Sequence, residues 1–161
     1  MTEASNDLIN MDLSTGRVVI RLRPDLAPLA AERLRALAAE GFYDDIVFHR
    51  VIPGFMAQAG DPTGTGTSGS HLPDLKAEFT NAAKFERGTL GMARTMNPDS
   101  ANSQFFIMFE PCPSLDGQYT IAGEVIEGME HIDQIKKGRG SSGMVTDPDK
   151  IVKMRPADQE G

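Results

Sequence analysis

The chain has 161 residues, of which 40% are hydrophobic and 24% are charged, a composition that is ordinary for one soluble globular domain. Its net charge of -7 argues against nucleic-acid binding as the main role, because contact with a phosphate backbone requires a basic surface. The sequence contains no apolar run of about 18 residues and does not start with a basic, then apolar segment, so we expect neither a membrane span nor a secretory signal.

The cysteine content favours a reducing compartment. Cys112 is the single cysteine of the chain, so no internal disulfide can form. We therefore predict a cytoplasmic protein with one domain over 1–161, a core at about 7–155 and a short tail at 156–161. Because no long apolar stripe remains after the elements below are assigned, a monomer is expected.

Strands account for most of the predicted elements. Apolar and polar residues alternate in DLINMDL and RVVIRL, which predicts a β-hairpin with Gly16 in its turn. Many strands with few helices favour a closed barrel, because closure removes exposed edges, although composition alone leaves a sandwich possible. Further short strands are predicted at 46–50, 55–59, 89–94, 104–108, 120–125 and 151–154.

Two helices are predicted between these strands. Over 28–39 apolar residues recur at helical spacing, Pro28 suits the first turn, and Gly41 follows the end. A shorter helix is predicted over 127–137, before Gly138. Its shared apolar face consists of Met129, Ile132 and Ile135.

Strand periodicity suggests a surface that is both apolar and amide-bearing. It places Met56 and Gln58 on one face of their strand, and it places Phe106 opposite Phe105 on another strand. One face of a closed barrel lies outside, so one of the two aromatic side chains is expected to be only partly buried, which would indicate a binding site. From periodicity alone, burial of both in the core is the favoured interpretation.

Arg50 follows His49 in the segment 46–52, whose other residues are all apolar. The ordinary interpretation of such an arginine is that its guanidinium reaches water or pairs with a carboxylate. A functional interpretation needs a reaction in which a fixed positive donor is useful, and the surrounding motifs suggest one.

Three separated motifs carry a family resemblance. They are FHRVIPGFMAQAGD at 48–61, SANSQFFIMF at 100–109 and SLDGQYTIAGEV at 114–125, and together they resemble a cyclophilin, a peptidyl-prolyl cis-trans isomerase. The resemblance extends from about Asp7 to Ile151, and the loop RTMNPDSANSQFF is similar to bacterial members. It implies a mainly β fold, a closed eight-stranded antiparallel β-barrel capped by two α-helices, and catalysis without cofactor or metal.

The resemblance also implies the site residues. Arg50 corresponds to the catalytic arginine of the family. Rotation about an X-Pro bond must overcome a barrier of about 18–20 kcal/mol, and the nitrogen of the twisted bond regains its lone pair. A fixed donor directed at that nitrogen stabilises only the transition state. The implied substrate groove consists of Phe55, Met56, Gln58, Ala93, Arg94, Gln104, Phe106, Leu115 and Tyr119.

Two positions depart from the family pattern. Tyr119 stands where many members carry a histidine, and Ser114 stands where many carry a tryptophan or a phenylalanine. Tyrosine keeps a flat apolar edge and a hydroxyl, so we expect isomerisation to survive the first change. Because Ser114 lacks an indole N–H, we expect weak binding of cyclosporin.

The implied partners are proline-containing peptides and unfolded protein clients. An alternative is a proline-binding or chaperone-like module with little turnover, which has no need for a donor at Arg50. A formal G-x-G-x-x-G match at 64–69 suggests a dinucleotide-binding turn, but Pro73 interrupts any immediate helix and no βαβ unit surrounds it.

The remaining polar residues support less specific predictions. His49, His71 and His131 lack the short spacing of a metal site, and His49 is predicted to be a structural histidine with satisfied hydrogen bonds. The segment PTGTGTSGS is predicted to be a flexible loop, and the acidic residues are predicted to form solvated surface.

Overall fold

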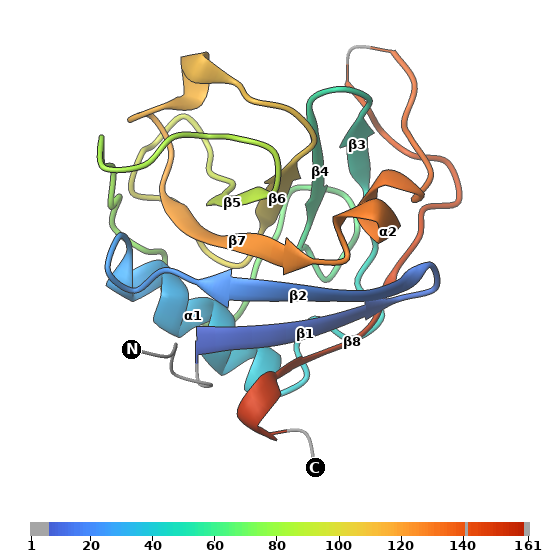
Figure 1. The fold of residues 1–161 in the computed structure, drawn as a ribbon, viewed down its shortest axis with the longest axis horizontal. Helices are drawn as coiled ribbons and strands as arrows, with labels where there is room; N and C mark the ends of the chain where they lie inside the picture. The colour runs from blue at the N-terminus through green and yellow to red at the C-terminus, as the bar shows by residue number, and fades with distance from the viewer. Residues whose placement is uncertain (1–6, 141, 160–161) are drawn as a thin grey trace.

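A single antiparallel sheet forms the body of the protein. The computed structural model describes residues 7–140 and 142–159, and its sheet has the strand order β3-β4-β6-β5-β7-β2-β1-β8 (Figure 1). This arrangement confirms the predicted mainly β fold. The strands are β1 (Leu8–Leu13), β2 (Gly16–Leu22), β3 (Arg50–Ile52), β4 (Met56–Ala59), β5 (Thr89–Met92), β6 (Phe105–Met108), β7 (Ile121–Glu127) and β8 (Ile151–Pro156).

The sheet curls until its two edges meet. Just before β3, the Phe48 N–H donates to the Asp149 carbonyl at 2.8 Å, and the Ile151 N–H of β8 donates to the Ile46 carbonyl at 2.8 Å. These bonds join the β3 side to the β8 side and close the barrel, which removes the exposed edges. The strand predicted at 46–50 is therefore mostly this irregular junction, and the regular strand starts later.

The hairpin formed by β1 and β2 confirms the predicted turn. Gly16 has a φ of +142°, a conformation that side chains other than glycine resist. A Cβ atom at this position would also lie 2.5 Å from the His131 ring. Both the backbone and the neighbouring ring therefore require glycine here.

Helix α1 (Pro28–Ala39) has the predicted bounds and packs against β7 and β8. Its buried face includes Leu34 and Leu37. The Glu78 carboxylate accepts hydrogen bonds from the backbone N–H groups of Leu29 at 3.0 Å and Ala30 at 2.9 Å. It thereby satisfies N–H groups that have no partner inside the helix.

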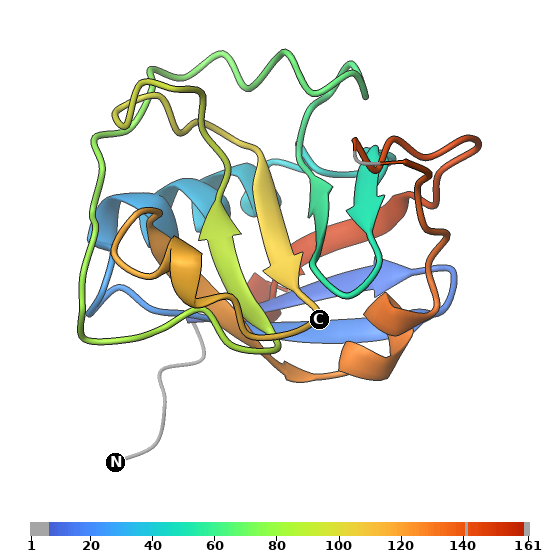
Figure 2. The same cartoon turned by 90° about the horizontal axis from the view of Figure 1, so that it is seen from above.

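Helix α2 (Met129–Asp133) is shorter than the predicted 127–137, and it lies well apart from α1 (Figures 1 and 2). At its start, β7 continues through Glu127, which pairs with β2. At its end, the Lys136 N–H donates to the Asp149 carboxylate at 2.7 Å instead of continuing the helix. The described residues also include the short 3-10 helices η2 (Pro113–Leu115) and η3 (Ala157–Gln159).

The barrel interior is a single apolar core. Tyr43 and Phe105 are fully buried and meet edge to face, with ring centroids 5.5 Å apart. The Tyr43 hydroxyl donates to the Ser103 carbonyl at 2.9 Å, and burial raises the pKa of Tyr43 above its usual range. The Tyr43 hydroxyl, the polar group of this side chain, therefore has a hydrogen-bond partner inside the core.

A second apolar cluster covers the opposite face of the sheet. It contains Met56, Phe85, Phe106, Met108 and Ile121, all buried. Phe105 is fully buried and Phe106 is only 5% exposed, which confirms the burial of both rings favoured by periodicity alone. The alternative expectation, that one of the two rings is only partly buried, was wrong. The physical reason is that segments outside the barrel contribute rings and side chains that cover this face.

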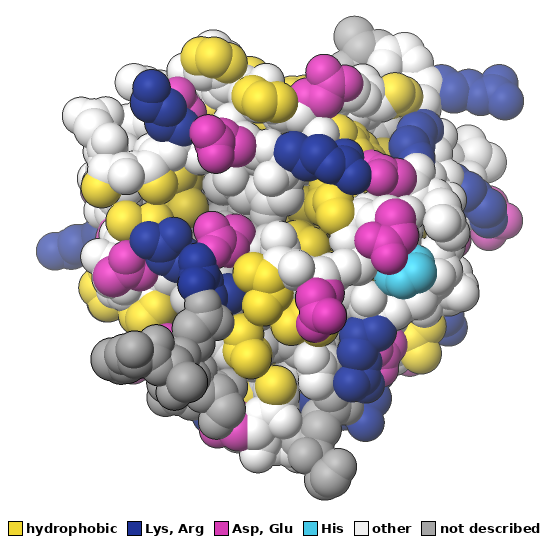
Figure 3. Space-filling model, viewed as in Figure 1, with side chains coloured by type: hydrophobic (Ala, Val, Ile, Leu, Met, Phe, Trp, Pro, Cys, Tyr) yellow, Lys and Arg dark blue, Asp and Glu magenta, His cyan; other side chains and the backbone are white. Residues whose placement is uncertain are grey.

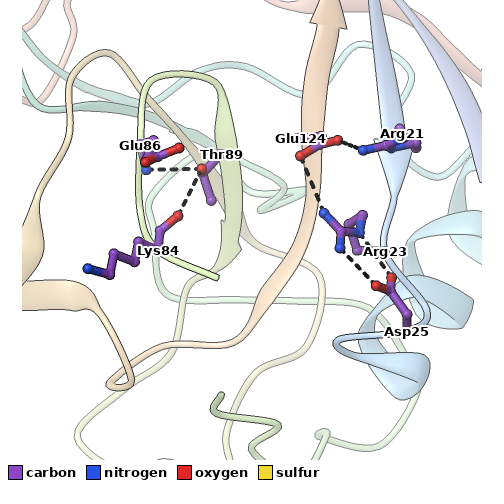
Figure 4. A network of polar contacts seen from close by, with 7 residues as sticks. All are labelled: Arg21, Arg23, Asp25, Lys84, Glu86, Thr89 and Glu124. Atoms are coloured by element: carbon purple, nitrogen blue, oxygen red, sulfur yellow. Dashed lines mark hydrogen bonds and ion pairs between the residues drawn. The ribbon is translucent and has the colours of Figure 1, made fainter. Parts of the chain in front are cut away.

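Ion pairs connect neighbouring strands at the surface. Glu124 of β7 forms an ion pair with Arg21 of β2 and a second ion pair, at 3.5 Å, with Arg23 (Figure 4). Arg23 also binds Asp25 at 2.8 Å, and this hydrogen bond lowers the pKa of Asp25. In Figure 3, basic side chains lie beside acidic ones and form no continuous basic patch on the face in view. The helices of the described residues lack the length and apolar character that a membrane span requires.

Candidate active site

Strand register aligns three of the predicted site residues in one row. Arg50 of β3 lies directly opposite Gln58 of β4, and Gln58 lies opposite Phe106 of β6. Directly paired residues project from the same face of a sheet, so a guanidinium, an amide and an aromatic ring are neighbours. The row ends at Gly91 of β5, where a Cβ atom would lie 2.6 Å from the Phe106 ring. Glycine therefore lets this ring lie close to the sheet.

A cavity of about 200 Å³ opens beside this row. It adjoins a larger cavity of about 510 Å³, which shares Gln58, Ala93 and Arg94 with it and is also lined by Gln104. The structure thus brings all ten predicted site residues to two adjoining cavities. Those that line the smaller cavity are Arg50, Phe55, Met56, Gln58, Ala93, Arg94, Phe106, Leu115 and Tyr119.

Neutral groups hold the Arg50 guanidinium. Its Nε donates to the Ser142 carbonyl at 2.8 Å, and its Nη1 donates to Oε1 of Gln58 at 3.3 Å. Within the part of the chain that the structure describes, no carboxylate pairs with Arg50. Of the two ordinary interpretations of this arginine, pairing with a carboxylate was therefore wrong, whereas the half-buried side chain is consistent with a guanidinium that reaches water. Because arginine stays protonated in proteins, the site holds an uncompensated positive charge at a fixed position.

A series of side-chain amides fixes the orientation of Gln58. Its Nε2 donates to Oε1 of Gln104 at 2.9 Å, and Nε2 of Gln104 donates to the Ser68 carbonyl at 2.9 Å. Each amide therefore has one defined orientation, and Gln58 presents its oxygen to Arg50. The Ala93 N–H donates to the Gln104 carbonyl at 3.0 Å, so this N–H is not available to a bound peptide.

The loop that supplies the Ser68 carbonyl is organised by a buried carboxylate. Asp61 is fully buried and accepts hydrogen bonds from the Thr63 hydroxyl at 2.7 Å and from the backbone N–H groups of Gly66 at 2.5 Å and Thr67 at 2.9 Å. The prediction that the acidic residues form solvated surface was wrong for Asp61. The hydrogen bonds to its carboxylate give the loop, which was predicted to be flexible, a defined conformation. An aspartate followed by Thr, Ser and Gly residues is typical of such turns and was the available sequence signal.

Asp61 should make the protein sensitive to acid. Burial by itself raises the pKa of Asp61, but the hydrogen bonds outweigh it and lower this pKa to about 2. A depressed folded-state pKa means that the stabilisation is complete above the unfolded-state value near 3.8 and is lost as the pH falls toward 2. Asp61→Asn should cost about 2 kcal/mol at neutral pH.

The measurement is urea unfolding between pH 7 and pH 2. The difference in unfolding free energy between wild type and Asp61→Asn should shrink as the pH falls. Other carboxylates with lowered pKa values, such as Asp44 beside Arg155, are present in both proteins and cancel in this comparison. A difference that stays constant over this range would show that the Asp61 charge does not stabilise the fold.

Aromatic rings form the apolar wall of the smaller cavity. Phe106 stacks on Phe85 with centroids 5.7 Å apart, and it meets Tyr119 edge to face at 5.6 Å. The Arg94 guanidinium lies 4.5 Å from the centre of the Tyr119 ring. A small pocket with apolar walls and a few fixed polar groups suits a flat ring such as that of proline.

Sequence reasoning missed the segment that positions Arg50. Ser142 acts through its backbone carbonyl, so its side chain carries no signal of this role. The adjacent Gly143 has a φ of +71°, and a Cβ atom there would lie 2.4 Å from Ile52 of β3. Also missed were residues that line the larger cavity, namely Gly66, Thr67, Ser68, Asp74, Thr95, Ser100 and Asn102.

Gly143→Ala should lower the isomerase activity that the resemblance implies, because it displaces the Ser142 carbonyl that holds Arg50. Gly140→Ala is the matched control, because Gly140 has a similar φ of +68° but an added methyl group there would meet no atom within 4 Å. We expect kcat/KM to fall about tenfold in Gly143→Ala alone, since small misplacements of catalytic groups are costly. The NMR signal of the Arg50 Nε–H should shift in the same variant. Equal activities of the two variants would contradict this positioning role.

His49 differs from its prediction. It is buried, but its Nδ1 has no hydrogen-bond partner, so the prediction of a satisfied structural histidine was wrong. Burial lowers the pKa of His49, which favours the neutral ring. The ring lies beneath Gly66, where a Cβ atom would be 3.1 Å from Nε2.

The competing motifs find no support in the arrangement of the chain. The next regular element after the 64–69 segment is β5, so no helix follows this segment as a dinucleotide-binding turn requires. Among the residues described, no group of three His, Cys, Asp or Glu side chains is placed to hold a metal ion.

Comparison with known proteins identifies the class. Residues 8–156 match the cyclophilin type peptidyl-prolyl cis-trans isomerase/CLD family, and the chain belongs to this family. A probable peptidyl-prolyl cis-trans isomerase of Brucella suis is 51% identical over 155 residues, covering 89% of this chain and 79% of the relative. A peptidyl-prolyl cis-trans isomerase of Schizosaccharomyces pombe is 38% identical, covering 90% and 96% of the two chains.

Solved structures agree with this assignment. A Cryptosporidium parvum cyclophilin, crystallised in the presence of the dipeptide Ala-Pro, superposes with a TM-score of 0.86 at 31% identity. The match covers 92% of this chain and 98% of that one. A cyclophilin from Hirschia baltica has a TM-score of 0.88 at 24% identity and covers 100% and 77% of the two chains, which supports the fold.

Proposed function

We propose that this protein catalyses cis-trans isomerisation of X-Pro peptide bonds, with Arg50 as the catalytic residue. The observation that carries the proposal is the row of Arg50, Gln58 and Phe106 beside a cavity of about 200 Å³. Family membership supports the same conclusion, as does the structure of the Cryptosporidium relative determined in the presence of the dipeptide Ala-Pro.

The chemistry follows from the fixed donor and the apolar pocket. The proline ring lies against Phe106, Met56 and Leu115, which keeps it still while the preceding carbonyl rotates. In the twisted state the proline nitrogen regains its lone pair, and Arg50 donates a hydrogen bond to it. In the planar ground state that lone pair is delocalised, so the interaction favours the transition state and lowers the barrier.

The direct test is the exchange rate of an Ala-Pro tetrapeptide measured by NMR. We expect catalytic amounts of the protein to accelerate cis-trans exchange. The alternative function, a proline-binding or chaperone-like module, predicts peptide chemical-shift changes without faster exchange. That result from a folded wild-type protein would overturn the proposal and would direct attention to Tyr119 and Ser114.

We further propose that the clients are unfolded chains whose folding waits for proline isomerisation. The uncatalysed step takes tens to hundreds of seconds, so it often limits folding. A monomer in the cytoplasm is the state that we propose for this role. Ser114 precedes Leu115, which lines the smaller cavity, and its hydroxyl lies 3.2 Å from the Cys112 sulfur. Because a hydroxyl stands where many family members carry an indole N–H, we propose weak cyclosporin binding. Refolding of a proline-limited client, with and without the protein, tests the folding role.

A further inference from the structure

Most arginines of the protein are neutralised by a carboxylate. Figure 4 shows two of them, Arg21 and Arg23, both paired with Glu124. Such pairs leave little net charge at the surface. The pairs outside Figure 4 are Arg17–Asp12 at 2.7 Å, Arg35–Asp158 at 3.0 Å, Arg87–Asp133 at 2.6 Å and Arg155–Asp44 at 2.8 Å.

Of the ten arginines, four have no carboxylate partner among the described residues, and two of these four, Arg50 and Arg94, lie at the site. Arg50 binds a carbonyl and an amide oxygen, and Arg94 donates to the carbonyls of Thr95 and Gln118, both at 2.9 Å. Among the described residues, neither has a carboxylate partner within ion-pair distance. Both remain fully charged, because arginine is not deprotonated in proteins. Two uncompensated positive charges therefore lie at the substrate site of a chain whose net charge is -7.

Arg94 lies at the junction of the two cavities and is held firmly. It lines both cavities, and its guanidinium lies over the rings of Tyr119 at 4.5 Å and Phe79 at 5.6 Å. A guanidinium has five N–H donors, and two of them are occupied by the carbonyl contacts. The Nε atom is buried without a hydrogen-bond partner. The carbonyl contacts hold the group in place and leave one N–H on each of Nη1 and Nη2 for an anionic acceptor.

Acidic side chains are unevenly distributed around the two cavities. The lining of the smaller cavity contains two arginines and no Asp or Glu. The larger cavity is lined by one carboxylate, Asp74, which accepts a hydrogen bond from Asn102 at 3.0 Å. The attraction for a negative group should therefore be strongest near the smaller cavity and its junction with the larger one.

We propose that this enzyme prefers X-Pro substrates that carry an Asp or Glu side chain within two residues of the proline, and that Arg94 determines this preference. The inference rests on the proposed isomerase function and specifies its substrate class. A bound carboxylate gains a charge-assisted contact with Arg94 that a neutral amide of the same shape does not gain. The effect should be about fivefold in kcat/KM, as for a favourable partly exposed ion pair.

The test compares tetrapeptides with Glu, Gln or Lys placed one residue before, two residues before or one residue after the proline. Exchange rates are measured by NMR in low salt and again in about 0.3 M salt. We expect one Glu peptide to be turned over about fivefold faster than its Gln counterpart and the Lys peptide to be slowest. The ratio should shrink in high salt because exposed charges are screened.

Two variants locate the effect. Arg94→Gln should reduce the Glu-to-Gln ratio to about one, whatever its absolute rate. Arg35→Gln changes the net charge equally but lies on α1 beside Asp158, and it should leave the ratio intact. A wild-type ratio of one, or a ratio that survives in Arg94→Gln, would overturn the inference while isomerisation of neutral peptides persists. No acceleration of any peptide would instead overturn the proposed function.

Discussion

Arg50→Ala is expected to reduce kcat/KM for an Ala-Pro peptide by a factor on the order of 100, the scale found when one preorganised transition-state donor is removed. The side chain is half-buried and forms no ion pair with the described residues, so its loss should leave the fold intact. The measurement is NMR exchange at equal protein concentrations, with the melting temperature and a two-dimensional spectrum as evidence of folding.

Arg50→Lys distinguishes charge from geometry. Lysine keeps the positive charge but lacks the planar fork that bridges the Ser142 carbonyl and Gln58. We therefore expect this variant to recover little of the lost activity. Wild-type exchange rates in a folded Arg50→Ala protein would refute the catalytic role of Arg50. Unchanged peptide binding with lost exchange would support it.

Phe105→Ala and Phe106→Ala should have different consequences although the two residues are adjacent in β6. Phe105 fills the barrel interior against Tyr43, and its truncation should cost about 3–5 kcal/mol of unfolding free energy. Phe106 lies on the opposite face and lines the smaller cavity. Its truncation should destabilise the protein and also remove the wall for the proline ring.

Urea unfolding and peptide exchange, measured on the same samples, separate the two roles. We expect folded Phe105→Ala to keep much of its activity per folded molecule, whereas folded Phe106→Ala should lose most of it. Phe106→Leu controls for hydrophobic volume, since it retains apolar contact without the flat ring. Equal activity of folded Phe105→Ala and Phe106→Ala would contradict the assignment of Phe106 to the site.

Local patterns predicted the elements that depend on near neighbours in sequence. The hairpin at Gly16 and helix α1 have the expected positions, because turn glycines and helical periodicity act over a few residues. The α2 prediction was too long because pairing of Glu127 with β2 and the Lys136–Asp149 hydrogen bond are contacts between distant parts of the chain. Periodicity does not contain such contacts.

The sequence by itself determined the family, the mainly β fold and the residue types of the site, since these depend on motifs and on alternation along each strand. Only the tertiary structure decided how those residues act together. The Ser142 carbonyl that holds Arg50 and the buried Asp61 that organises the neighbouring loop depend on barrel closure and burial. A backbone carbonyl is present at every residue, so the sequence gives no signal that one of them holds Arg50. An aspartate at the surface is solvated by water, whereas a buried aspartate must accept hydrogen bonds from the protein groups around it, and the sequence does not show which aspartate is buried.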